Sequence, residues 1–428
     1  DKSWEYSIPR GEQAVFSNNG AYLVGKIKPL YAQTRKAKID KKKTDELPKD
    51  SLFIFSINDQ KLKVIPSVKS FQLAEKGNDL LVYLNDKKGD ISKEGSDLIV
   101  FQLETKVEHV FKNIVQYTIN PKGSSVLAYR VGSKQSNSAI LLINANDTTG
   151  KIINKNFFSA NQLVWDDNGT QAAYLIEQDS TSKALQKNYQ LRYFNSNLDS
   201  GIIISTNNAM PIQYVFGADK KINFSKSGAR IILGIQPLLP AKDTSLPEFE
   251  RVSLDIWNSN ESLLQSNQLK TLDASLKSTE PLVLNTKQKS LMYLGKINDR
   301  EVRFTNDGDG RFVYFSNDSA DLRASQWQGF TFKDLYVIDL NDGKNEMFHK
   351  SFKGNILFPS AQGNKVVYYD EPKKQYFVYD PLQHKKTIIA KDIKYPLFDE
   401  EFDMPDDPNA HGVAKWMDDE NGILIYDH

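Results

Sequence analysis

One arrangement of hydrophobic and polar residues recurs along the whole chain: a hydrophobic run, a short polar turn that ends in glycine, and a second hydrophobic run. Short runs of Ile, Leu, Val, Phe and Tyr bounded by such turns predict antiparallel β-strands. The closing glycines are mostly 46–59 residues apart, with one interval of 82. The turns are residues 17–20, 75–77, 120–123, 166–169, 225–228, 308–310, 362–363 and 419–422.

A repeat of this length made of short strands predicts an all-β fold, a β-propeller. The 428 residues hold seven to eight blades of about four antiparallel strands each. Two remnants, residues 4–9 as an outer strand and 413–428 as inner strands, either complete one shared blade or belong to different blades of a larger chain. The predicted pairs of hydrophobic runs are 14–28 with 52–66, 71–84 with 97–112, 115–131 with 139–154, 162–176 with 189–205, 222–236 with 252–257, 302–317 with 334–350, and 356–370 with 375–391.

Because each blade packs only on its neighbours, a propeller can exceed the size of an ordinary domain. Residues 1–428 are therefore predicted to form a single propeller domain. The chain starts at Asp1 and stops within or just after a predicted strand. We expect it to be a fragment of a longer protein.

Two insertions interrupt the repeat. Residues 32–49 are rich in Lys and Arg and predict a solvated, mobile loop; the alternative is a site for a polyanion or an acidic partner. Residues 259–277 have leucines at helical spacing and predict a short helix that packs on the core or on a blade edge; the alternative is a helix that docks a partner. The basic residues of the first insertion are Arg35, Lys36, Lys38, Lys41, Lys42 and Lys43.

A third insertion is acidic and carries the candidate contact residues. Asp399, Glu400, Glu401, Asp403, Asp406 and Asp407 lie here with two prolines. Carboxylates coordinate Ca²⁺ or hold an ammonium group, but the spacing matches no EF-hand loop and the prolines predict an irregular connection between blades. His411 follows this stretch. The candidate contacts to a substrate or partner are Glu400, Glu401, Asp403 and His411.

Composition and motifs exclude several functions. The 55 Lys and Arg residues balance 54 Asp and Glu residues, which argues against a nucleic-acid partner. No apolar run approaches the ~18 residues of a membrane span. The chain has no cysteine, and therefore no disulfide, catalytic thiol or Cys-based metal site.

The sequence also lacks the motifs of several kinds of active site. It has no GxSxG, no P-loop, no GxGxxG after a strand and no pair of histidines at zinc-helix spacing. No catalytic, cofactor-binding or metal-binding residue is assigned. Four tryptophans on or near strands are predicted to fill the space between blades, or alternatively to stack on carbohydrate: Trp165, Trp257, Trp327 and Trp416.

Several short segments, in this order and spacing, resemble the propeller of bacterial peptidases of the prolyl oligopeptidase and dipeptidyl peptidase IV family. They are spread over almost the whole chain. They are Ile8-Pro9-Arg10-Gly11, residues 34–38, residues 47–52, Leu254-Asp255-Ile256-Trp257, residues 334–340, Leu397-Phe398-Asp399-Glu400, Asp406-Asp407-Pro408, Gly412-Val413-Ala414 and Ile425-Tyr426-Asp427-His428.

The resemblance implies a non-catalytic propeller that gates and docks peptide substrates for an α/β-hydrolase domain. That domain would carry the Ser, Asp and His of the triad and would lie C-terminal to residue 428. A bacterial, periplasmic or secreted location is implied in the same way. The dipeptidyl peptidase branch binds the peptide amine with paired Glu residues on a propeller insertion. Glu400 and Glu401 are adjacent, but they lie in a different setting.

Two other functions stay open at this point. One is a stand-alone interaction propeller of the Tol or WD-repeat type, which needs no peptidase domain. The other is a carbohydrate-active propeller, which needs two carboxylates about 5–10 Å apart in its channel.

Overall fold

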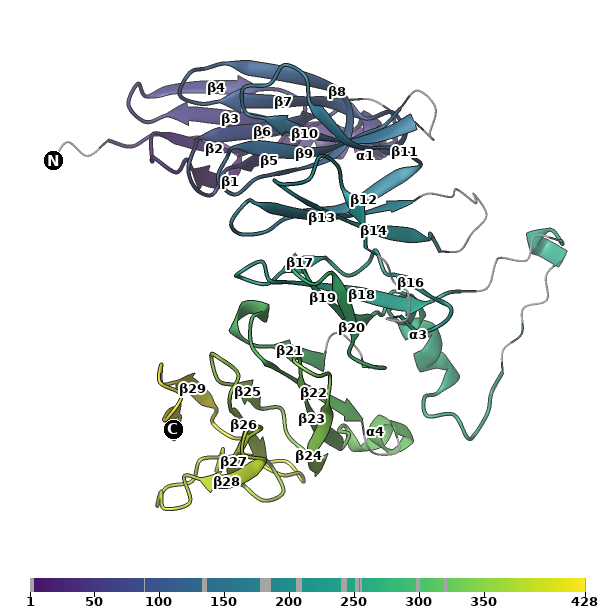
Figure 1. The fold of residues 1–428 in the computed structure, drawn as a ribbon, viewed down its shortest axis with the longest axis vertical. Coiled ribbons are helices and arrows are strands. Elements are labelled where there is room, and N and C mark those ends of the chain that lie inside the picture. Colours follow the sequence, from purple (N-terminus) through teal and green to yellow (C-terminus); the bar gives the residue numbers. More distant parts are fainter. Residues whose placement is uncertain are drawn as a thin grey trace. The chain divides into compact units, whose positions relative to one another are not determined.

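A computed structural model describes residues 4–87, 89–132, 137–177, 186–204, 210–239, 245–250, 254, 256–297, 301–318 and 322–427 (Figure 1). The described chain divides into two compact units, Asp1–Ser205 and Thr206–His428. Each unit is described by itself. The prediction of one domain over residues 1–428 stays a prediction.

Unit 1 is built from antiparallel strands that pair with their neighbours in sequence and form four blades. Blade 1 is β1 (Gly11–Phe16), β2 (Tyr22–Ile27), β3 (Ser51–Ser56) and β4 (Lys61–Ile65); blade 2 is β5 (Val68–Leu73), β6 (Leu80–Asn85), β7 (Ser96–Gln102) and β8 (Glu108–Ile119); blade 3 is β8, β9 (Ser125–Arg130), β10 (Ser138–Asn144) and β11 (Lys151–Phe157); blade 4 is β12 (Ser159–Trp165), β13 (Gln171–Glu177), β14 (Tyr189–Asn195) and β15 (Ile202–Ile203).

Unit 2 repeats the pattern in three blades and one two-stranded sheet. Blade 5 is β16 (Tyr214–Phe216) and β17 (Asn223–Phe224), which both pair with β18 (Arg230–Pro237), then β19 (Glu280–Asn285) and β20 (Ser290–Tyr293); blade 6 is β21 (Val302–Phe304), β22 (Phe312–Asp318), β23 (Lys333–Asp339) and β24 (Asn345–Phe352); blade 7 is β25 (Leu357–Pro359), β26 (Val366–Asp370), β27 (Gln375–Asp380) and β28 (Lys385–Ile389); blade 8 is β29 (Val413–Trp416) and β30 (Ile423–Ile425).

The long strand β8 serves two blades. Its first half pairs with β7 and its second half with β9, and Ile114 is opposite both Ser96 and Arg130. The bend needs a close backbone approach, because a Cβ at Gly95 would lie 2.2 Å from the carbonyl carbon of Asn113. Gly95 also has a φ of +63°, a conformation that glycine adopts without strain.

The central strands of blades 1 to 7 are largely buried, and because successive side chains of a strand point to opposite sides, both faces of these strands contribute to the core. In β6, Leu80 and Val82 pack with blade 3, whereas Leu81 and Tyr83 pack with blade 1. Blades 3 and 4 share a cluster in unit 1. In unit 2, blades 5 and 6, 6 and 7, and 7 and 8 share clusters in the same way. This face-to-face stacking of consecutive meanders confirms the predicted all-β propeller fold.

The predicted glycine turns all connect the first and second strands of a blade, and residues in or beside consecutive turns are joined by hydrogen bonds within each unit. In unit 1 the pairs are Asn18 N to Asp79 Oδ1 (2.8 Å), Lys76 N to Pro121 O (2.8 Å) and Asn120 Nδ2 to Gly169 O (2.7 Å). In unit 2 they are Ser227 N to Asp309 Oδ2 (2.7 Å), Asn306 N to Ala361 O (3.0 Å) and Gln362 N to Glu420 Oε1 (2.6 Å). We call this end of a blade the turn end.

In the part of the chain that the structure describes, four helices occupy connections between the second and third strands of a blade. These connections lie at the opposite end of an antiparallel blade, here called the insertion end; Figure 1 labels α1, α3 and α4. The helices are α1 (Tyr31–Ile39), α2 (Ile91–Glu94), α3 (Gln265–Leu276) and α4 (Leu322–Gln328). Short 3₁₀ turns occur at Thr44–Glu46, Glu248–Glu250 and Asn306–Gly308.

The structure corrects four predictions on strands and insertions. Residues 4–9 contain no strand, and the described residues of 252–257 contain none either; β18 pairs with β19 instead. Residues 32–49 include most of α1 and are not an irregular loop, because Ala, Gln, Arg and Lys favour helix. The helix predicted at 259–277 exists as α3, but none of its residues is buried, so it does not pack in the core.

Two of the four tryptophans lie where predicted. Trp165 donates from Nε1 to Thr118 O (3.4 Å), and Trp416 donates to Phe358 O (3.1 Å). Both bonds reach the first strand of the preceding blade. Trp257 and Trp327 are 70% and 72% exposed, so they do not fill the space between blades.

Candidate functional site

The acidic stretch lies in the connection from β28 to β29, at the insertion end of unit 2. It has no helix and one isolated bridge, Phe398 to Ala410, as the prolines predict. Asp406 Oδ1 contacts Nζ of Lys353, and Asp407 Oδ2 lies 2.7 Å from the same nitrogen. Lys353 follows β24 and is only 4% exposed. The cation that Asp406 and Asp407 bind is therefore the side chain of a lysine of the same chain.

Lys353 also joins this connection to the α4 insertion. Its Nζ lies 4.1 Å from the ring centre of Phe330, just beyond α4, which is cation–π geometry. Burial would lower the pKa of Lys353, but its hydrogen bonds to Asp406 and Asp407 raise it overall. The hydrogen bond from Lys353 lowers the pKa of Asp406. The buried Glu371 nearby has a raised pKa, mainly because of its burial.

The four predicted contact residues lie on or next to this anchored connection. Glu400, Glu401 and Asp403 are exposed, and their carboxylates form no ion pair with a described residue. His411 follows the bridge, is partly buried, and donates its backbone N–H to Leu397 O (3.1 Å). Three carboxylates thus face solvent, while Asp406 and Asp407 fix the stretch that carries them.

Helices α3 and α4 form a second part of the insertion end of unit 2. The Gln326 side chain accepts hydrogen bonds from Leu264 N (3.3 Å) and Asn267 Nδ2 (3.1 Å). Large apolar side chains stay exposed around this contact, including Leu269 (59%) and Trp327 (72%). This end of unit 2 therefore presents exposed carboxylates and exposed apolar side chains.

A buried cluster on β24 and β26 superficially resembles a catalytic triad. His349 Nδ1 lies 2.8 Å from the Tyr368 hydroxyl, and His349 Nε2 lies 3.4 Å from Asp370 Oδ2. All three residues are at most 6% exposed, so a substrate cannot reach them. Burial raises the pKa of Tyr368 well above its usual range, which keeps the hydroxyl neutral. We assign this cluster to packing.

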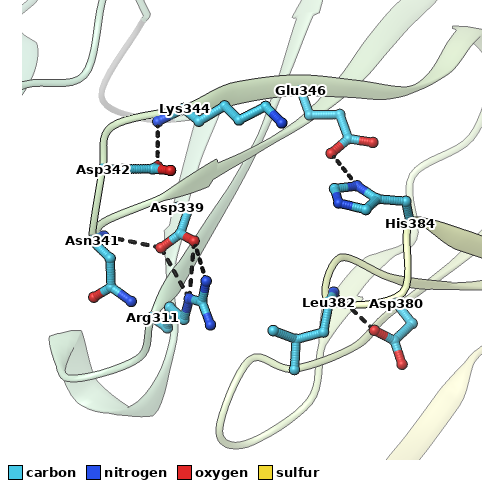
Figure 2. Close-up of polar contacts among 9 residues, drawn as sticks. All are labelled: Arg311, Asp339, Asn341, Asp342, Lys344, Glu346, Asp380, Leu382 and His384. Carbon is cyan, nitrogen blue, oxygen red and sulfur yellow. Dashed lines mark hydrogen bonds and ion pairs between the residues drawn. The ribbon is translucent and has the colours of Figure 1, made fainter.

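A polar hollow of about 180 Å³ lies at the turn end, between blades 6 and 7 (Figure 2). Arg311 holds Asp339 with two nitrogens, Nε at 2.9 Å and Nη2 at 2.6 Å from Oδ2. Across the hollow, Glu346 lies 2.7 Å from Nδ1 of His384 and accepts a hydrogen bond from the Tyr379 hydroxyl (2.6 Å).

The carboxylates of this hollow mostly hold its own turns. Asp339 accepts from Asn341 N (2.9 Å), and Asp380 accepts from Leu382 N (2.9 Å). Burial would raise the pKa of Asp339, but the Arg311 hydrogen bonds and that from Asn341 lower it overall. The lining residues include no Ser, Thr or Cys. The hollow is therefore lined mainly by charged side chains, and its lining residues supply no hydroxyl or thiol nucleophile.

An apolar groove runs along β30, with a volume of about 650 Å³. Its apolar wall includes Ile389, Trp416 and Ile425. Within the described residues, β30 pairs only with β29, which leaves one strand edge open. This groove is suited to packing a strand rather than to holding a small polar ligand.

The sequence pointed to the acidic stretch but not to Lys353, Phe330 or the hollow. Lys353 has no local motif, and its partner Asp406 is 53 residues away. Among the described residues, no three His, Asp or Glu side chains are placed to hold a metal ion. None of the helices described is both long and apolar enough to cross a bilayer.

No family model matches the sequence, and no curated protein matches it. Among solved structures, the chain is similar to Porphyromonas gingivalis dipeptidyl peptidase 4, with 10% identity, coverage of 90% of this chain and 54% of that one, and a TM-score of 0.43. A structure from a study of two prolyl endopeptidases has 8% identity, coverage of 89% and 49%, and a TM-score of 0.39. TolB from Acinetobacter baumannii has 8% identity, coverage of 79% and 75%, and a TM-score of 0.28.

The chain spans about half the length of the two peptidases. The structural matches therefore include peptidases, which agrees with the peptidase family that the sequence segments resemble. With identities of 8–10% and TM-scores of 0.28–0.43, the matches carry no argument about activity.

Proposed function

We propose that this chain is the propeller part of a bacterial serine peptidase, and that it gates and docks peptides for an α/β-hydrolase domain of the same polypeptide. The supporting observation is the ordered set of resembling segments, together with their positions in the blades. Residues 334–340 form most of β23, and Asp406 and Asp407 bind the buried Lys353. The first resembling segment ends at Gly11, where β1 begins.

The insertion end of unit 2 is the proposed docking surface. Glu400, Glu401 and Asp403 are exposed carboxylates on a connection fixed by Lys353, so they suit the ammonium group of a peptide N-terminus. His411 lies on the same connection and is proposed as a further contact. A periplasmic or secreted location belongs to the same proposal.

The reading frame downstream of His428 tests the proposal directly. We expect an α/β-hydrolase domain with a Gly-x-Ser-x-Gly sequence after a strand. A natural polypeptide without such a domain would overturn the peptidase function and leave a stand-alone interaction propeller, for which capture of a defined protein partner would be the positive result.

Substrate kinetics of the complete polypeptide test the docking surface. The variant Glu400→Gln, Glu401→Gln and Asp403→Asn should raise KM at least about ten-fold for a peptide with a free N-terminus, because a hydrogen bond to a charged group is worth about 1.5–3 kcal/mol and about 1.4 kcal/mol is a factor of ten. The same peptide with an acetylated N-terminus should show no change.

The matched control removes three exposed acids from turns elsewhere, Glu75→Gln, Glu104→Gln and Asp219→Asn. It should leave KM for both peptides unchanged. An equal KM for the free and acetylated peptides in the parent protein would exclude amine recognition by these carboxylates.

A further inference from the structure

Helix α1 has an outer face that the fold of unit 1 does not use. The helix spans nine residues, and Ala37 alone among them is buried. It and the turn after it carry six exposed cations: Arg35, Lys36, Lys38, Lys41, Lys42 and Lys43. The chain as a whole has a net charge of only +1, so this is a local concentration of positive charge.

The six cations differ in their pairing from Lys28 and Lys49, which lie just before and just after this stretch. Lys28 lies 2.9 Å from Asp50, and Lys49 lies 3.4 Å from Asp86. None of the six forms an ion pair with a described residue, although Asp40, Asp45 and Glu46 are in the same stretch of sequence. Their charge is therefore directed to solvent.

Large apolar side chains lie among these cations. At 3.6 residues per turn, Tyr31, Arg35 and Ile39 lie along one side of the helix. Tyr31 is 80% exposed and Ile39 is 59% exposed, and Leu30 just before the helix is 49% exposed. Cations and apolar side chains are thus exposed together on this short stretch, and both kinds of side chain contribute to binding at the surface of an anionic membrane.

Folding alone gives only a partial reason for this composition. Lysines in the last turn of α1 stabilise the helix, because they lie at the negative end of the helix dipole. However, like charges three residues apart in the helix, such as Arg35 and Lys38, repel one another and weaken a helix. An anionic partner would relieve that repulsion.

We propose that the outer face of α1 binds an anionic lipid surface. Five of the six cations are Lys, whose compact charge suits a diffuse anionic surface, whereas paired recognition of single carboxylates or phosphates favours Arg. The exposed Tyr31, Ile39 and Leu30 would enter the headgroup region. This attachment is peripheral and independent of the proposed peptidase function.

Vesicle sedimentation of the 428-residue chain tests the proposal. We expect binding to vesicles that contain about one-third phosphatidylglycerol, no binding to pure phosphatidylcholine vesicles, and release as salt rises from about 0.05 M to about 0.5 M. Each cation near the surface contributes about 1 kcal/mol, or about five-fold in affinity. The variant Arg35→Gln, Lys38→Gln and Lys42→Gln should therefore bind about a hundred-fold more weakly. The variant Tyr31→Ser and Ile39→Ser should also bind more weakly, with an unchanged salt dependence.

The matched control removes three exposed lysines elsewhere in unit 1, Lys61→Gln, Lys76→Gln and Lys106→Gln. It should bind as the parent does, and circular dichroism should show all variants folded. Absence of binding to the anionic vesicles would overturn the proposal, as would equal weakening by the control. Binding to polyglutamate or to an oligonucleotide without vesicle binding would overturn it in favour of an acidic protein or a nucleic acid.

Discussion

Replacement of Lys353 by Met tests how the acidic connection is fixed. Methionine keeps most of the apolar stem and removes the charge, so the change isolates the ion pairs and the contact with Phe330. The Lys353 side chain is 5% exposed, whereas those of Asp406 and Asp407 are both 37% exposed. The loss should thus fall between that of a fully buried pair, about 3–5 kcal/mol, and that of a surface pair, about 0–1 kcal/mol.

We expect the ion pairs to account for about 2 kcal/mol and the cation–π contact for about 1 kcal/mol. Lys353→Met should therefore lower the free energy of unfolding of unit 2 by about 2–3 kcal/mol. For a unit of this length, that corresponds to a decrease in Tm of about 5–10 °C.

Thermal and urea unfolding, followed by circular dichroism and by hydrogen exchange of residues 396–411, measure this effect. The matched control is Lys415→Met, which removes an ion pair with Asp418 whose side chains are 69% and 92% exposed. It should change stability by less than about 0.5 kcal/mol.

Adding Asp406→Asn and Asp407→Asn to the Lys353→Met variant should recover part of the loss, because the unpaired carboxylates no longer repel each other and Glu371. A Lys353→Met protein as stable as the parent, with unchanged exchange at 396–411, would refute this account of the connection.

Three further predictions concern packing and pH. Gly95→Ala should lower the free energy of unfolding by about 2 kcal/mol or more in urea titrations, because Gly95 has a φ of +63° and a Cβ there would collide with Asn113; a neutral effect would contradict the bend assigned to β8. The pKa values of Asp339, Asp370 and Asp406 are lowered, so the stability that they contribute should be complete above their ordinary value of 3.8 and be lost as pH falls through the folded-state values; a Tm of unit 2 that stays constant from pH 7 to about pH 2 would exclude this. The pKa of Glu371 is raised above 4.5, so the folded protein loses stability as pH rises and this buried carboxyl becomes charged. Glu371→Gln removes the charge and should therefore raise the Tm at pH 7 but not at pH 4.

The blades could be predicted from the sequence because their central strands are buried on both faces. In β6 and β26 nearly every residue is apolar, and a polar glycine turn precedes each strand, so both boundaries are visible in the sequence. The turns were found at the right positions for the same reason. Their mutual hydrogen bonds were not predicted, since these join residues about one blade apart.

The errors arise where a hydrophobic pattern does not reveal burial. Leu254 and Ile256 alternate like a strand, yet they are 75% and 61% exposed. The true partner of β18 is β19, in which Leu282 and Leu284 are fully buried. In α1 the charges suggested a loop, although its residue types favour helix.

In the candidate site, too, the sequence predicts some features and not others. The acidic residues within 399–407 are evident in the sequence, and the two prolines predict an irregular connection. Which carboxylates are free and which are engaged depends on Lys353, and that contact exists only in the folded chain. Sequence alone therefore identified the stretch but not its anchor.

Peptide hydrolysis by the 428-residue chain and by the complete natural polypeptide tests the central claim most directly. The claim predicts that the complete polypeptide cleaves chromogenic peptides and is blocked by a serine-directed inhibitor, whereas the chain alone produces no cleavage above buffer. Inhibitor-sensitive cleavage by the chain alone, or no cleavage by the complete polypeptide, would contradict it.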